Sequence, residues 1–90
     1  MGNFLKENNY KHDQAKVVPL SMVIKHHSDK TLQELTNRID ELNLLTIVLK
    51  REINIDEHGF EIILYTCVDN YDLLTLRILQ GVKVVHAVVL

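Results

Sequence analysis

The chain contains few residues that could constrain it covalently or bind phosphate through the backbone. Its 90 residues include one cysteine, one proline and three glycines. A single cysteine, Cys67, cannot form an internal disulfide, and no secretory signal is evident, so we expect a cytoplasmic protein. The three glycines, Gly2, Gly59 and Gly81, are isolated from one another. The sequence therefore has no glycine-rich loop for a phosphate group.

An excess of charge of one sign and a long hydrophobic run are also missing. Ten Lys and Arg are mixed with twelve Asp and Glu, which gives a formal net charge of −2. This balance excludes the basic surface that binds a nucleic-acid backbone, so we expect no nucleic-acid partner. No apolar stretch approaches the ~18 residues of a membrane-spanning helix, and we expect no direct membrane insertion. A chain of 90 residues with 47% hydrophobic content is predicted to form one globular core.

The first half of the chain predicts a lead-in, a strand and a helix. Residues 1–16 are polar and charged, so we expect a flexible lead-in to a domain over residues 17–90. Residues 17–25 are mostly β-branched and apolar, which favours a first strand. Thr31 and Glu34 have the spacing of a capping box, and apolar residues follow at steps of three and four. This pattern predicts one amphipathic helix that continues to Leu42.

The second half predicts a hairpin, a short helix and a final strand. Residues 44–55 alternate with a period of two, which is typical of a strand with one buried face. This alternation places Leu45, Ile47, Leu49, Ile53 and Ile55 on that face, with Arg51 as the exception. Asp56-Glu57-His58-Gly59 predicts a four-residue turn, so that a third strand over residues 60–68 returns antiparallel. Asp69 and Asn70 are expected to cap a helix over residues 71–80, and residues 82–90 are expected to form the last strand.

The order of these elements, β-α-β-β-α-β, predicts the fold class. It is typical of an α+β, ferredoxin-like two-layer sandwich. We expect an antiparallel sheet in the order 4-1-3-2, with both helices on one face.

The face of this sheet away from the helices is expected to be apolar. The set expected to face the helices is Leu45, Ile47, Leu49, Phe60, Ile62 and Leu64. The set expected on the open face is Val23, Val48, Ile63, Tyr65, Cys67, Val85, Ala87 and Val89. Of these, the predicted interface residues are Val23, Val48, Ile63, Tyr65, Val85 and Val89. An apolar centre with a charged rim is typical of a protein interface, so we predict a homodimer formed through this face or through the last strand. The alternative is a monomer whose open face is covered by residues 1–16.

Histidines and the cysteine are the residues most able to carry chemistry. The chain has five histidines, and the expected topology places His26 and His27 at the same end of the sheet as His58. A metal site formed by these three is one hypothesis, and solvated loop residues are the alternative, because the spacing matches no recognised ligand motif. No histidine is expected beside Cys67. Nucleophilic catalysis and a cofactor are therefore not predicted, and we expect the protein not to be an enzyme.

The closing segment Leu79-Gln80-Gly81-Val82-Lys83-Val84-Val85, with the order of elements over residues 17–90, resembles the ACT-like regulatory domains. The resemblance implies a non-enzymatic regulatory module that pairs with copies of itself. It also implies that a small effector binds where the first strand meets the first helix. In this chain the corresponding residues are His26, His27, Ser28, Asp29 and Thr31, with no glycine among them. The chain is also similar to the cytoplasmic C-terminal domain of MgtC/SapB-type membrane proteins, which implies a cytoplasmic part of a transport-related membrane protein.

Overall fold

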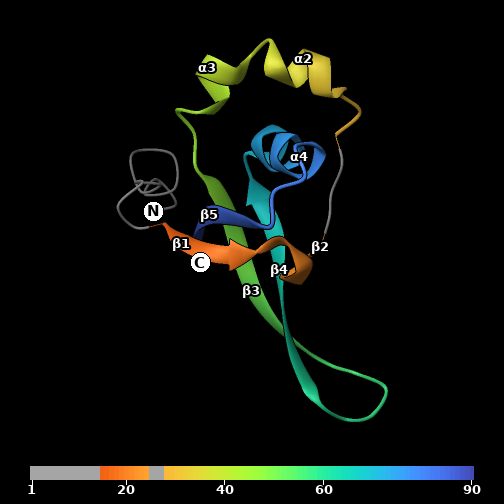
Figure 1. Ribbon diagram of the computed structural model, residues 1–90. Helices are drawn as coiled ribbons and strands as arrows, with labels where there is room; N and C mark the ends of the chain where they lie inside the picture. Colours follow the sequence, from red (N-terminus) through yellow and green to blue (C-terminus); the bar gives the residue numbers. More distant parts are fainter. Residues whose placement is uncertain (1–14, 25–27) are drawn as a thin grey trace.

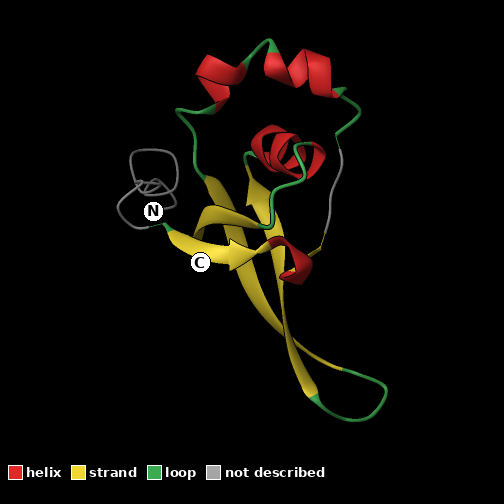
Figure 2. Ribbon diagram, viewed as in Figure 1, coloured by secondary structure: helices red, strands yellow, loops and turns green. Residues whose placement is uncertain are grey.

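A computed structural model describes residues 15–24 and 28–90 of the chain (Figure 1). The elements are β1 (Lys16–Pro19), the 3₁₀ turn η2 (Leu20–Met22), β2 (Val23–Ile24), α2 (Leu32–Thr36), α3 (Ile39–Leu42), β3 (Ile47–Ile55), β4 (Glu61–Asp69), α4 (Tyr71–Leu79) and β5 (Val84–Val89). The predicted α+β class is confirmed. Helix α4 lies next to a five-stranded mixed sheet, and α2 and α3 lie beyond α4 (Figure 2).

The sheet is strongly curled, because its two edge strands are almost consecutive in the chain. Its order is β1-β5-β3-β4-β2. Four inter-strand steps would separate the edges of a flat sheet by ~19 Å, whereas the chain from Pro19 to Val23 spans at most ~14 Å. The sheet therefore bends until η2 bridges its edges, and the Leu20 amide donates to the Lys83 carbonyl oxygen at 2.9 Å.

The expected strand order 4-1-3-2 and the expected antiparallel sheet are wrong in two respects. The predicted first strand is broken at η2, and its halves pair with different strands: β1 pairs antiparallel with β5, and β2 pairs parallel with β4. In addition, β5 pairs parallel with β3 through Ile47, Val48 and Leu49. The two parallel pairings make the sheet mixed, and the pairing of β5 with β3 changes its order. The predicted antiparallel hairpin of β3 and β4 is retained.

The hairpin loop is one residue longer than predicted, which reverses the faces of β4. Gly59 has the expected positive φ of 85°, but Ile55 pairs with Glu61, so five residues lie between the paired positions. The carboxylate of Asp56 accepts hydrogen bonds from the amides of His58 and Phe60, both at 2.9 Å. A shift of one residue moves every side chain of a strand to its other face. The odd-numbered residues of β4 up to Cys67, which pairs with Leu49, therefore share a face with Leu49, in contrast to the expectation.

The core lies between α4 and one side of the curled sheet, which we call the inner face. The buried cluster comprises Val18, Leu20, Val23, Leu35, Leu42, Ile47, Leu49, Cys67, Leu73, Leu74, Leu76, Val85 and Ala87. Three of these residues come from β1, η2 and β2. The segment that joins the edges of the sheet is thus held by apolar packing from inside.

The predicted helix over residues 31–42 is divided into α2 and α3. The capping box at its start is confirmed: Thr31 Oγ1 accepts from the Glu34 amide at 3.1 Å, and Glu34 Oε1 accepts from the Thr31 amide at 2.9 Å. The backbone of Arg38, with φ −108° and ψ 18°, interrupts the helix. Leu35 and Leu42 are both fully buried, one on each side of the break. No helix within the described ranges is long and apolar enough to cross a membrane.

Candidate functional site

Two of the residues predicted to bind an effector, Ser28 and Thr31, make hydrogen bonds within the chain. His26 and His27 lie outside the described residues. The Ser28 amide donates to Thr75 Oγ1 of α4 at 3.2 Å, and the hydroxyl and amide of Thr31 are used in the capping box. Asp29 is exposed. Effector binding by this loop remains a prediction.

Of the three residues proposed for a metal site, the structure describes only His58, because His26 and His27 lie outside the described residues. His58 lies at the tip of the hairpin, and its Nε2 is 3.9 Å from Glu57 Oε1. Ile24, which precedes His26 and His27 in the chain, pairs with Thr66 at the other end of β4. Glu61 and Thr66 alone are ~17 Å apart along the strand. Among residues 15–24 and 28–90, no group of three or more His, Cys, Asp or Glu side chains is placed to hold a metal ion.

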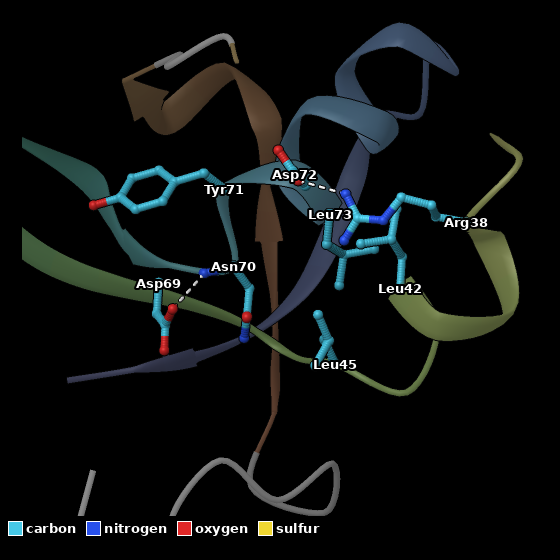
Figure 3. Close-up of a pocket in the computed structure, with 8 residues that line it drawn as sticks. All are labelled: Arg38, Leu42, Leu45, Asp69, Asn70, Tyr71, Asp72 and Leu73. Atoms are coloured by element: carbon cyan, nitrogen blue, oxygen red, sulfur yellow. Dashed lines mark hydrogen bonds and ion pairs between the residues drawn. The ribbon is translucent and has the colours of Figure 1, made fainter. Parts of the chain in front are cut away.

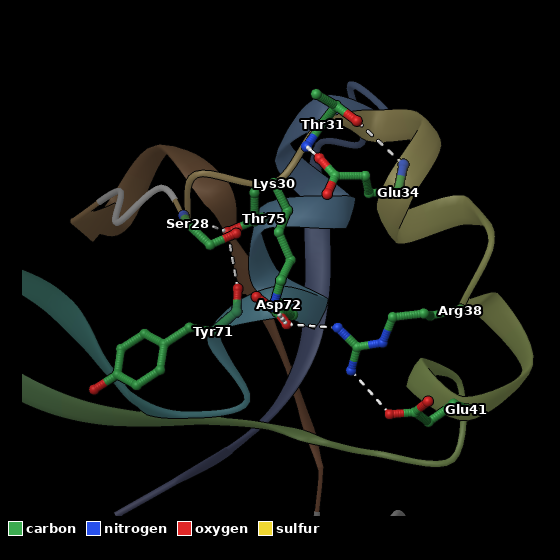
Figure 4. Close-up of polar contacts among 9 residues, drawn as sticks. All are labelled: Ser28, Lys30, Thr31, Glu34, Arg38, Glu41, Tyr71, Asp72 and Thr75. Atoms are coloured by element: carbon green, nitrogen blue, oxygen red, sulfur yellow. Dashed lines mark hydrogen bonds and ion pairs between the residues drawn. The ribbon is translucent and has the colours of Figure 1, made fainter.

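An ionic cluster centred on Asp72 joins the loop before α2, the α2–α3 break and α4 (Figure 4). Asp72 Oδ2 accepts from Lys30 Nζ at 2.7 Å and from Arg38 Nη1 at 2.8 Å, and Arg38 Nη2 donates to Glu41 Oε1 at 2.8 Å. The hydrogen bond from Lys30, then that from Arg38, lowers the pKa of Asp72. Every charged group of this cluster already has a partner of opposite charge, so we interpret it as a clamp between helices.

A shallow depression of about 280 Å³ lies beside this clamp, at the start of α4 (Figure 3). Its polar wall is formed by Arg38, Asp69, Asn70 and Asp72. The Arg38 guanidinium donates to the Asp72 carboxylate. The main-chain amide of Asn70 donates to Asp69 Oδ1 at 2.8 Å, and the side-chain amide of Asn70 donates to the Thr46 carbonyl oxygen. These internal hydrogen bonds use the groups that would otherwise orient a ligand.

Cys67 is a buried thiol on the inner face, 2% exposed. Burial raises the pKa of the Cys67 thiol to about 11, and its Sγ donates to the Asp69 carbonyl oxygen at 3.2 Å. A thiol with so high a pKa is almost wholly protonated at neutral pH and is a poor nucleophile.

The largest unsupported part of the sheet is the hairpin of residues 50–64, which we call the arm. Leu49 is the last residue of β3 that pairs with β5, and Tyr65 is the first of β4 that pairs with β2. Between these points β3 and β4 pair only with each other, and the hairpin extends away from the helices (Figure 1). A two-stranded ribbon alone is at most marginally stable in water.

The inner face of the arm carries two exposed isoleucines between charged residues. Three cross-strand pairs follow one another on it: Arg51 with Tyr65, Ile53 with Ile63, and Ile55 with Glu61. Ile53 is 57% exposed and Ile55 is 63% exposed. These two isoleucines continue the apolar row of Leu49 beyond the end of the core.

The root of the arm is hollowed on the same face. A cavity of about 230 Å³ is lined by Lys16, Val17, Val18, Arg51, Ile63, Tyr65 and Val89. Its floor is apolar, because Val18 belongs to the core and Tyr65 and Val89 pack against it. Two cations, Lys16 and Arg51, line the same hollow.

Charge is distributed unevenly along the arm. Asp56, Glu57 and Glu61 lie at or beside the tip, whereas Lys16 and Arg51 lie at the root. Within the part of the chain that the structure describes, neither Arg51 nor Glu61 forms an ion pair. The inner face of the arm is therefore positive at the root and negative at the tip, and Glu52 lies on the opposite face.

The predicted interface residues occupy different places from those expected. Val23, Val48 and Val85 are buried within the chain, and Ile63, Tyr65 and Val89 are half-buried. All but Val48 belong to the inner face or pack against its core. A buried side chain offers no surface to a partner, so only the half-buried three, at the root of the arm, can contribute to one.

Sequence reasoning assigned Ile53 and Ile55 to the helix-facing side and did not identify them as surface residues. They are on that side, but no helix reaches them. The lengths of the elements indicate that part of the hairpin is left uncovered, because a nine-residue helix spans ~14 Å, whereas a nine-residue strand spans ~30 Å. A strand of that length projects beyond such a helix.

These features define an α+β domain with a curled mixed sheet and a two-stranded, apolar arm. Comparisons with protein-family models, with curated proteins and with solved structures give no match. The likeness to ACT-like and MgtC/SapB-type domains therefore stays a prediction from the sequence.

Proposed function

We propose that this chain is a non-enzymatic assembly module of the cytoplasm that pairs with a second copy of itself through the inner face of the arm. One observation carries the proposal: Ile53 and Ile55 are 57% and 63% exposed on one face, between side chains of opposite charge. Water contact with two adjacent isoleucines is unfavourable, and their burial against a partner removes it.

The charges on this face favour a second copy as the occupant. A partner surface of one sign would meet a like charge at either the root or the tip of the arm. Another copy carries both signs at the same spacing, so a reversed arm meets each charge with its opposite. The proposal depends on this property of the arm and not on the resemblance to a family.

The non-enzymatic part of the proposal is supported by the state of the groups that would carry chemistry. The Cys67 thiol is buried with a raised pKa. Asp72 and Arg38 are bound to each other in the clamp.

The arm sets the expected strength of pairing. It is about 20 Å long and two strands wide, so two arms packed face to face bury less than the ~800 Å² per partner of a standard interface. We therefore expect a reversible dimer in the micromolar range or weaker.

Sedimentation velocity of the full chain, from low micromolar to millimolar concentration, tests the proposal. The wild type is expected to shift reversibly from monomer to dimer, and Ile53→Glu is expected to stay monomeric. Ile62→Glu is the matched control, because Ile62 is exposed on the opposite face of the same arm. A wild type that remains monomeric at the highest concentration overturns the proposal. So does dissociation by Ile62→Glu but not by Ile53→Glu, which assigns pairing to the other face.

A further inference from the structure

From the order of side chains on the inner face of the arm, we infer that the two arms cross antiparallel about a two-fold axis at the Ile53–Ile63 pair, so that each tip closes the root hollow of the other copy. This inference rests on the proposed function, since it specifies how the same surface pairs. It names the residues that the second copy contributes to the hollow.

The spacing along the arm permits this reversal. The Arg51–Tyr65, Ile53–Ile63 and Ile55–Glu61 pairs are consecutive on one face and are separated by ~7 Å along the strands. A two-fold axis through the middle pair places the first pair of one arm over the third pair of the other. A symmetric interface requires this kind of self-complementarity.

The chemistry of the two outer pairs decides between antiparallel and parallel arms. In the antiparallel arrangement, Arg51 and Tyr65 face Ile55 and Glu61 of the partner subunit. One guanidinium and one carboxylate then lie at each end of the interface. Parallel arms would put both guanidiniums at one end and both carboxylates at the other, which is repulsive.

The hollow at the root of the arm gives a second reason for the antiparallel arrangement. The hollow has a volume of about 230 Å³ and an apolar floor of Val18, Tyr65 and Val89. In the antiparallel arrangement the hollow lies opposite Ile55 of the partner subunit. The cations Lys16 and Arg51 then face the acidic tip. An unpaired arm leaves this space open.

Charge reversal tests the arrangement. Arg51→Glu and Glu61→Arg each place like charges at both ends of the dimer, and we expect each to raise the Kd about tenfold. The double variant Arg51→Glu/Glu61→Arg restores opposite charges and is expected to return the Kd to within about threefold of the wild type. Arg51 and Glu61 are exposed and outside the core, so circular dichroism should show an unchanged fold.

Cross-linking provides a second measurement that does not depend on charge. Ile53→Cys places a thiol at the axis, and a short bis-maleimide is expected to link two copies through it. Ile62→Cys, on the opposite face, is expected not to cross-link, and the buried Cys67 is expected to stay unmodified. Two outcomes overturn the antiparallel arrangement and leave self-association standing. In the first, the wild type dimerises but the double charge variant does not recover the wild-type Kd. In the second, the copies cross-link through position 62 but not through position 53. A monomeric wild type instead removes the proposed function itself.

Discussion

Asn70 donates a hydrogen bond from its side-chain amide to the main-chain carbonyl oxygen of Thr46, 24 residues earlier in the chain. Asn70 is also the one non-glycine residue of the described chain with a positive φ, at φ 62° and ψ 48°. The sequence predicts that Asp69 and Asn70 cap α4, but the Asn70 side chain makes no capping hydrogen bond. Its role is to tie the start of α4 to the start of β3.

The Asn70 conformation predicts an order of stability among substitutions. Asn70→Ala loses the bond to Thr46 and replaces a residue that tolerates the left-handed region with one that does not, so it is expected to lower the free energy of unfolding by about 2–3 kcal/mol. Asn70→Gly also loses the bond, but glycine tolerates the backbone angle, so the free energy of unfolding is expected to fall by only about 1 kcal/mol. Urea unfolding of both variants measures the difference. Equal losses would contradict a contribution from the backbone conformation.

The clamp around Asp72 predicts acid sensitivity. Because Lys30 and Arg38 lower the pKa of Asp72 in the folded state, its contribution is complete above the pKa of the unfolded chain, near 4. It is lost as the pH falls through the lower folded-state pKa. Glu34 and Glu41, whose pKa values are lowered by hydrogen bonds from Thr31 and Arg38, add to the same trend.

Asp72→Asn is expected to lower the free energy of unfolding at pH 7 by about 1 kcal/mol, since the side chain is 22% exposed and partly screened. Between pH 4 and pH 2.5 the variant should lose less stability than the wild type. Urea unfolding at both pH values tests this. Asp40→Asn, at an exposed position of α3, serves as the control and should retain the acid sensitivity caused by the Asp72 clamp.

Burial of Cys67 predicts slow reaction with thiol reagents. With its pKa raised to about 11 by burial, we expect the native thiol to react with an aromatic disulfide reagent at pH 8 at least about a hundredfold more slowly than in denaturant. Absorbance of the released thiolate follows both reactions. Comparable rates would mean that the thiol is accessible in the native state.

Because η2 connects the two edges of the sheet, a substitution of Leu20 is expected to lower the stability of the fold strongly. This side chain is buried in the core between β1 and β2, so Leu20→Ala is expected to cost about 2–4 kcal/mol of unfolding free energy. Val17→Ala removes apolar atoms from the same segment, but Val17 is 60% exposed, and a change within about 0.5 kcal/mol is expected. Thermal or urea unfolding compares them. A small effect at Leu20 would show that the bridge between the sheet edges is not held by the core.

Much of the secondary structure follows from local sequence. The capping box of Thr31 and Glu34, the positive φ of Gly59 and the end of α4 before Gly81 are each set by residues within one turn of the chain. The break at Arg38 was not predicted, because the heptad-like spacing of the apolar residues continues through it. The arginine there reaches Asp72, 34 residues later, which no local pattern reveals.

The candidate site was only partly accessible to sequence reasoning. Alternation in β3 correctly placed Leu49, Ile53 and Ile55 on one face, because a strand has a period of two. The prediction of which β4 residues share this face was wrong, because the loop between the paired residues Ile55 and Glu61 has five residues and not four. One residue is enough to exchange the inner and outer faces.

By itself, the sequence determined the α+β class, the hairpin and the helix start at Thr31, because periodicity, caps and turn residues act between near neighbours. Only the tertiary structure decided that residues 17–25 break at η2, that β5 pairs with β3, and that the arm extends past the helices. Those outcomes depend on how distant segments pack around a shared core and on where that core ends, and no pattern within a single segment encodes either.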